Sequence, residues 1–403
     1  MSELDLGLKV NSRRLLWRMG FTTRVDVPLR TPVPSQVGRP KTSRFETFTD
    51  LDVLGIALVP GFALRKVISD CKTTQRGSTE RMFWIRGVSD FFDADDAWMV
   101  RSKDVTAASR QLASRLGISV MEPADLSKLE GFHPTDLDLE NGPLALLFDE
   151  AKVSTFAKVF TVLDKKLERL LAYRQFDYWV FDEYRNLQQV VAHLNYAQNV
   201  LDPNLPAHRA LFIDCAWLYA LSLAQAARHV RAVHVGEVDI ALQQYLFGGQ
   251  TGLLEKRKLA AVLERFAPGD ATSGVLPGWY PQLLELLVRH LRRPDAVIDE
   301  LRYAEWVAEA QVAKEHASLA DAFGSSFDPL PAKLLSDICG FLVTAAGLDP
   351  KFRIFSHGVF LNVDSDVSRE SNVEPVVSSE ISSEPEHDLD VSDRNLHPGP
   401  VEP

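Results

Sequence analysis

The sequence has 403 residues, of which 46% are hydrophobic and 25% charged, a composition typical of a globular protein. This length exceeds what one ordinary core supports, so two folded units are expected. No stretch of eighteen residues is free of charged or strongly polar groups, which argues against a membrane span; the most apolar stretch, residues 211–227, predicts a buried helix. The three cysteines have no zinc or disulfide spacing and the N-terminus does not read as a signal peptide, so we expect plain thiols in a cytoplasmic protein.

Charge is unevenly distributed along the chain. Residues 364–403 hold eleven acidic and two basic residues, a net charge of −9 out of the total of −11. Residues 1–120 hold 19 basic and 13 acidic residues, a net charge of +6, so residues 121–363 carry about −8. A positive surface suits a polyphosphate ligand, because each phosphate contact releases condensed counterions. The N-terminal part is therefore the part that we expect to meet nucleic acid.

The N-terminal pattern predicts a mixed α/β sheet. Residues 8–19 repeat apolar side chains at helical spacing and end at Gly20. Two later apolar runs joined through Pro60 and Gly61 predict a hairpin, and Ser78 is a suitable N-cap for a following helix. The expected strands are residues 21–29, 48–59, 65–73, 97–100 and 118–121, with helices at 8–19, from 78 through 91, and at 106–116. The order α-β-β-β-α-β-α-β implies a mixed sheet with helices on both faces.

After Pro123 the pattern becomes helical, with Leu, Ala and Phe in place of β-branched residues. The expected helices are residues 145–176, 182–197, 207–230, 237–247, 253–266, 280–290, 295–316 and 331–346. The last forty residues are rich in Ser, Glu, Asp and Pro and are expected to be disordered. The predicted organisation is an α/β domain at 1–125, an all-helical domain at 140–350 and an acidic tail at 364–403.

Three polar residues lie at the ends of the two hairpin strands. Asp52 begins one apolar run, and Asp70-Cys71-Lys72 ends the next after seventeen intervening residues. Antiparallel pairing places Asp52 beside Asp70, and Lys72 shares a face with Asp70 while Cys71 points into the packed side. Carboxylates are ligands that Mg²⁺ prefers, and the metal neutralises phosphate and lowers the pKa of an attacking water. The pattern predicts Asp52 and Asp70 as metal ligands, the Cys71 backbone carbonyl as a further ligand, and Lys72 as the group that orients water or stabilises charge at phosphorus.

This arrangement resembles the PD-(D/E)XK nuclease superfamily, in particular its restriction-endonuclease-like and Holliday-junction-resolvase-like branch. In that family an α-β-β-β-α-β core carries an acid on one strand and Glu-x-Lys or Asp-x-Lys on the next, and residues 8–121 follow this order. The resemblance implies metal-binding roles for Asp52 and Asp70 and a catalytic role for Lys72. Many relatives place a Glu on the first helix, whereas residues 9–19 contain no acid; Glu46 or Asp50 could substitute, and Asp50 shares a strand face with Asp52.

Other candidates lie on neighbouring helices. Gln75, Glu80 and Arg81, near the start of the helix after the motif, are candidates for phosphate or supporting contacts, or form a solvated helix face. Arg13 and Arg14, together with Arg18, form a basic stripe that either follows a DNA backbone or is simply solvated.

These features favour a Mg²⁺-dependent (or Mn²⁺-dependent) endonuclease that hydrolyses phosphodiester bonds in DNA. The helical domain is expected to bind a partner protein, recognise the substrate or regulate access, and family resemblance suggests a homodimer that acts in defence against foreign DNA or in repair. The competing interpretation is a non-catalytic protein that binds nucleic acid or a partner through a remnant nuclease fold.

Overall fold

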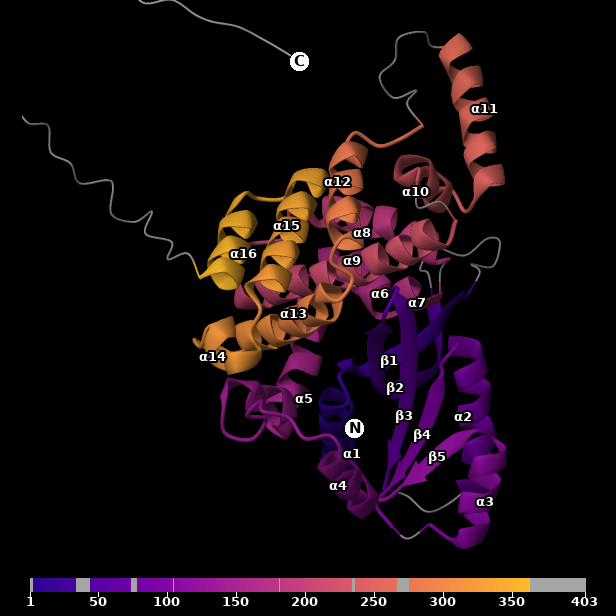
Figure 1. Cartoon of the computed structure of the whole chain (residues 1–403), viewed down its shortest axis with the longest axis vertical. Coiled ribbons are helices and arrows are strands. Elements are labelled where there is room, and N and C mark those ends of the chain that lie inside the picture. The colour runs from indigo at the N-terminus through magenta and orange to yellow at the C-terminus, as the bar shows by residue number, and fades with distance from the viewer. Residues whose placement is uncertain are drawn as a thin grey trace, which may run out of the picture. The chain divides into compact units, whose positions relative to one another are not determined.

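In the computed structural model, five strands lie in chain order across one mixed sheet (Figure 1). The strands are β1 (Thr22–Val33), β2 (Arg44–Val59), β3 (Ala63–Lys72), β4 (Asp96–Arg101) and β5 (Ile118–Met121). The structure describes residues 3–33, 44–73, 78–103, 105–180, 182–233, 236–266 and 275–362, which belong to one compact unit. The predicted acidic tail, 364–403, lies outside these residues.

The sheet has an antiparallel half and a parallel half. Strands β1, β2 and β3 pair antiparallel, whereas β3, β4 and β5 pair parallel. The parallel strands are connected by α2 (Ser78–Phe92) and α3 (Ala107–Arg115), as parallel pairing requires crossover connections. In the β2–β3 ladder Val53 is opposite Ser69, and the same register continued by one residue places Asp52 opposite Asp70. The predicted mixed sheet is confirmed.

Helices cover both faces of the sheet, as the element order predicts. On one face α1 (Glu3–Arg18) and α4 (Pro123–Phe132) pack through Leu15, Leu16 and Leu126 against Val53 and Cys71. On the other face lie α2 and α3 (Figure 1). The alternation of buried side chains along β2 and β3 sends neighbouring residues to opposite faces.

Local signals set several element ends. Gly20, with a φ of +88°, follows α1, and Gly117, with a φ of +68°, follows α3, which begins after the N-cap Thr106. The first helix begins at Glu3, five residues before the predicted start at residue 8. That difference brings Asp5 onto the helix.

The region after β5 is helical, as predicted, but it divides differently. The predicted helix over residues 145–176 is wrong as one element, because Asp149 and Asp164 accept hydrogen bonds from the amides of Lys152 and Lys166 and so begin new helices. The short elements there are η1 (Pro143–Phe148), α5 (Glu150–Val159), η2 (Phe160–Val162), η3 (Lys165–Leu167), α6 (Glu168–Ala172), the π-helical η4 (Tyr173–Asp177) and α7 (Tyr178–Val180).

The remaining helices, most of them longer, form most of the core. They are α8 (Glu183–Ala197), α9 (Pro206–Val233), α10 (Val238–Leu246), α11 (Gln250–Phe266), α12 (Tyr280–Leu291), α13 (Ala296–Ala313), α14 (Leu319–Phe323), η6 (Gly324–Ser326), α15 (Pro329–Ala346) and α16 (Lys351–Leu361). Two of these, α9 and α15, are long and apolar enough to cross a membrane, but 94% and 67% of their apolar windows are buried inside the protein. Helix α9 is thus the buried helix expected over residues 211–227. All three cysteines are buried and free, as expected.

Candidate functional site

The end of the β2–β3 hairpin brings Asp52 and Lys72 together. Asp52 is only 1% exposed, and its Oδ2 accepts a hydrogen bond of 2.8 Å from the backbone amide of Cys71. The Lys72 ammonium lies 3.2 Å from the same oxygen. Asp52 and Lys72 therefore lie close together, as predicted. The Cys71 side chain is buried against α1, as expected.

Asp70 is held by a different partner. The Nε of Arg81, on the first turn of α2, lies 3.1 Å from both carboxylate oxygens, and Nη2 of the same guanidinium bonds Oδ1. The guanidinium also stacks 3.6 Å from the centre of the Trp84 ring. Arg81 is thus a positioning partner of Asp70, which is one of the supporting contacts considered for it.

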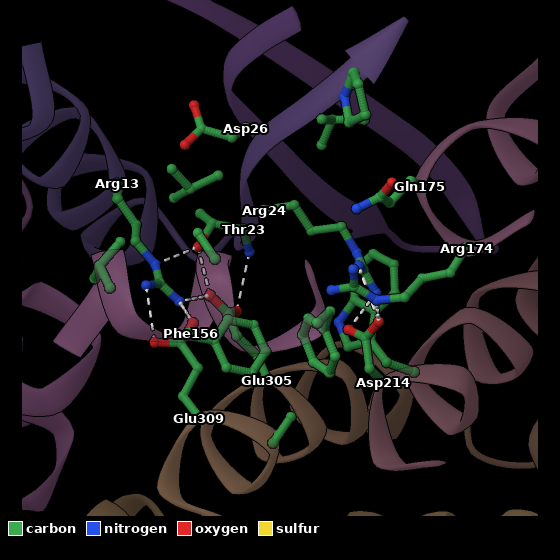
Figure 2. A pocket seen from close by; sticks show the side chains of 18 of the residues that line it. Arg13, Thr23, Arg24, Asp26, Phe156, Arg174, Gln175, Asp214, Glu305 and Glu309 are labelled. Atoms are coloured by element: carbon green, nitrogen blue, oxygen red, sulfur yellow. Dashed lines mark hydrogen bonds and ion pairs between the residues drawn. The ribbon is translucent and has the colours of Figure 1, made fainter. Parts of the chain in front are cut away.

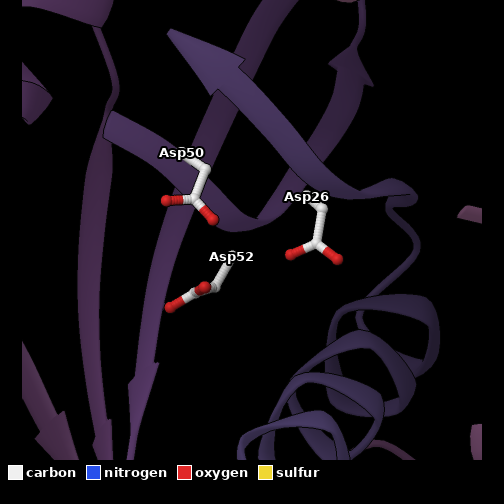
Figure 3. Close-up of side chains that lie close together, drawn as sticks. All are labelled: Asp26, Asp50 and Asp52. Carbon is white, nitrogen blue, oxygen red and sulfur yellow. The ribbon is translucent and has the colours of Figure 1, made fainter. Parts of the chain in front are cut away.

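Three acids gather on the β1–β2 side of Asp52. Asp26, Asp50 and Asp52 each offer an oxygen within 4.8 Å of the others, and Figure 3 shows the three carboxyl groups side by side. Asp50 lies two residues before Asp52 and shares its strand face, as predicted. Asp26 has a φ of 55° and interrupts the β1–β2 pairing between Val25 and Val27. We call Asp26, Asp50 and Asp52 the acid cluster.

Lys9 of α1 enters the acid cluster from the adjacent helix. Its Nζ lies 2.7 Å from Asp52 and 2.5 Å from Asp26, and its side chain is 3% exposed. Burial lowers the pKa of the Lys9 ammonium, but the carboxylates of Asp52 and Asp26 outweigh burial and raise that pKa above its ordinary value. Burial raises the pKa of Asp26 despite Lys9. The cluster therefore combines three carboxylates with two ammonium groups, those of Lys9 and Lys72.

The donor chemistry of the acid cluster fits a metal ion. All three donors are carboxylate oxygens, which are hard ligands of the kind that divalent cations such as Mg²⁺ take. Asp26 Oδ2 is a buried acceptor without a hydrogen-bond partner among the described residues. The cluster could bind a metal ion, and Lys9 would then compete with that ion for Asp52 and Asp26. Asp70 is not part of this three-acid group among the residues that the structure describes.

The predicted basic stripe on α1 is mostly neutralised. Arg13 is 1% exposed and bonds Glu305 and Glu309 of α13 at 2.7 and 2.6 Å, so the expectation that it is exposed is wrong. The cause is tertiary packing, because α13 covers that face of α1. Arg14 lies 3.0 Å from Glu130 of α4, which leaves it half-buried and paired.

Of three further candidates, one is exposed and the other two lie wholly or partly outside the described residues. Glu80 is exposed in the first turn of α2. Glu46 pairs with Thr31 in the β1–β2 ladder through its backbone, while its side chain lies outside the described part of the chain. Gln75 lies wholly outside the described residues.

Sequence reasoning did not find Lys9, Asp26 or Asp5. Asp5 lies on α1 and its Oδ1 accepts a hydrogen bond of 2.9 Å from the amide of Thr73, next to Lys72. It is an acid on the first helix near the end of β3, the kind of residue that seemed to be missing. A predicted first helix that began before residue 5 would have included Asp5. For Asp26, the available signal in the sequence was an acid between two valines, Val25 and Val27.

A small cavity of about 90 Å³ adjoins the acid cluster, where β1 meets the helical region (Figure 2). Asp26 lies at its edge. On one side Arg13 joins Glu305 and Glu309; on the other, Arg24 and Arg174 both bind Asp214 (Figure 2). Arg13 carries one positive charge for two buried carboxylates, those of Glu305 and Glu309. Burial therefore outweighs the attraction of Arg13 and raises the pKa of Glu309 to about 7. These buried ion pairs tie β1 and α1 to α9 and α13.

No protein-family model, no curated protein and no solved structure matches this chain. The geometry of the acid cluster and its surroundings is therefore the basis for assigning a function.

Proposed function

We propose that the protein is a metal-dependent nuclease of the PD-(D/E)XK type that hydrolyses phosphodiester bonds in DNA. The observation that carries this proposal is the position of Asp52, which lies within β2, 3.2 Å from the ammonium of Lys72 on β3, and in one group with Asp26 and Asp50. The α-β-β-β-α-β order and the mixed sheet around these residues are those expected from the resemblance.

Each residue has a distinct task in this proposal. Asp52, Asp50 and Asp26 would hold Mg²⁺ or Mn²⁺, with Asp70 as a further ligand once Arg81 yields it. The ion would supply charge neutralisation at the phosphate and a more acidic bound water. The Cys71 amide fixes the orientation of Asp52, and Lys72 places a compact positive charge where negative charge develops on the phosphate.

Isosteric substitutions test the proposal with little disturbance of shape. Asp52→Asn and Lys72→Met are compared with Asp136→Asn, a change at an exposed acid outside the cluster. Asp50→Asn, at the exposed member of the cluster, covers the case in which a buried substitution prevents folding. We expect the wild type and Asp136→Asn to cut plasmid DNA with Mg²⁺ or Mn²⁺, and the cluster variants to lose at least about a hundredfold in rate. A folded wild type that binds DNA and never cuts would refute the nuclease.

The second candidate is a non-catalytic protein that binds nucleic acid or a partner. One observation favours it: the Lys9 ammonium already pairs with both Asp26 and Asp52, so the cluster has a cation without any metal. On this alternative, Mg²⁺ has no effect on the stability of the wild type, and salt-dependent DNA binding occurs without cleavage. Roles in defence or repair, and the homodimer, remain expectations that cleavage assays on foreign and damaged DNA and sedimentation of the full chain would test.

A further inference from the structure

A second cavity, far larger than the one beside the acid cluster, opens between the η3–α6 segment and α8. Its volume is about 640 Å³, within the usual range for small-molecule sites. Its lining includes Lys165, Arg169, Arg185, His193 and Tyr196. None of these residues takes part in the proposed nuclease site.

The cavity carries more positive than negative side chains. Lys165, Lys166, Arg169 and Arg185 line it against only two acids, Glu168 and Asp177. Among the described residues, no carboxylate forms an ion pair with Lys165, Lys166 or Arg169, and Arg185 reaches only Asp182, at 3.4 Å. The N-cap Asp164 turns the chain so that both lysines begin a new helix at the rim. Clustered cations without carboxylate partners attract a multiply charged anion.

Aromatic groups stand beside these cations. The Tyr196 side chain is 59% exposed, although such rings are usually covered, and the Arg169 guanidinium lies 5.0 Å from its centre. An exposed aromatic ring next to a guanidinium offers a stacking surface for a nucleobase.

His193 adds a polar group at the inner wall. It is only 7% exposed, its ring stacks on Tyr173 with centroids 4.3 Å apart, and its Nδ1 has no hydrogen-bond partner among the described residues. Burial, with Arg169 nearby, lowers the pKa of His193 to about 4, so the ring is neutral at pH 7 and offers one donor and one acceptor. A buried polar nitrogen without a partner calls for an explanation, and a ligand that hydrogen-bonds the ring is one.

We propose that this cavity binds a nucleotide, with Lys165, Lys166 and Arg169 on the phosphates and the base stacked on Tyr196 within reach of His193. The nucleotide is either a free nucleoside triphosphate or a unit of a single-stranded nucleic acid, since both present phosphates next to a base. The proposal does not depend on nuclease activity, because the acid cluster and this cavity share no residue.

Binding is measured on the full chain in EDTA by calorimetry with ATP, adenosine, inorganic triphosphate and a short single-stranded oligonucleotide. The Asp52→Asn variant is included so that loss of the proposed metal site is distinguished from loss of this one; its binding is expected to equal that of the wild type. We expect ATP or the oligonucleotide to bind, triphosphate to bind more weakly and adenosine not to bind detectably.

Two exposed positions supply the variants, so folding is preserved. Arg169→Ala and Tyr196→Ala should each weaken binding about tenfold, whereas Arg292→Ala, at an exposed arginine outside the cavity, should leave it unchanged. Tyr196-dependent binding of ATP identifies a free nucleotide as the ligand, and Tyr196-dependent binding of the oligonucleotide alone identifies a nucleic acid strand. Triphosphate binding equal to that of ATP, equal affinity in both cavity variants and the control, or no binding of any probe would overturn the proposal.

Discussion

Lys9 is the residue whose removal most directly tests the acid cluster. In Lys9→Met the side chain keeps its length and apolar stem but loses the ammonium that bridges Asp26 and Asp52. Asp52 retains Lys72, whereas Asp26 loses its cation and remains largely buried. Unpairing a buried charge costs about 3–5 kcal/mol, and because Asp52 keeps one partner we expect about 3 kcal/mol less stability.

Urea unfolding of the full chain in EDTA, followed by tryptophan fluorescence, measures this loss, with Lys128→Met at an exposed position as the control. A loss below about 1 kcal/mol, the value of an exposed ion pair, would show that Lys9 does not neutralise a buried cluster. Repeating the urea unfolding with millimolar MgCl₂ tests whether the acid cluster binds a divalent ion. If the cluster binds a divalent ion, Mg²⁺ should stabilise Lys9→Met more than the wild type, because the competing ammonium is gone.

Two further predictions concern other buried contacts. Burial lowers the pKa of His290, but Glu300 at 3.0 Å outweighs it and raises that pKa above the ordinary value, so the protonated ring stabilises the fold. This stability is complete below about pH 6.5, the unfolded pKa, and falls as pH rises through the folded pKa; His290→Gln should flatten that fall in urea unfolding between about pH 6 and about pH 9. At Gly55 an added Cβ would lie 2.9 Å from Leu16 Cδ2, so Gly55→Ala should cost about 1–3 kcal/mol, whereas Gly131→Ala, with open space around it, should not destabilise.

A specific result would contradict each of these two predictions. A wild type and His290→Gln with the same pH dependence would mean that the ring is not charged in the fold. Equal stability of Gly55→Ala and Gly131→Ala would mean that α1 does not pack closely on β2.

Much of the α/β region was predictable because its signals are local. The hairpin needs only two apolar runs and the turn at Pro60 and Gly61, and this pairing alone brings Asp52 near Lys72. The end of α1 at Gly20 depends on a glycine that takes a positive φ. These features arise between residues close in sequence, which is where pattern reasoning is strongest.

The missed features depend on contacts between distant segments. Lys9 reaches Asp26 and Asp52 only because α1 packs across the sheet, and a lysine on an amphipathic helix looks solvated in sequence. Arg13 meets Glu305, which lies 292 positions further along the chain, a pairing that no local pattern reveals. The break in β1 at Asp26 is a backbone irregularity that periodicity averages away.

Lys9 and Arg13 connect the acid cluster to the helical region, because residues four apart lie on the same side of a helix. One turn of α1 places Lys9 in the acid cluster, and the next places Arg13 between Glu305 and Glu309 of α13. Glu305 also accepts hydrogen bonds from Trp17 and from the backbone of Thr23, so it fixes both α1 and the start of β1. The helical region therefore sets the position of the helix and the strand that deliver Lys9 and Asp26.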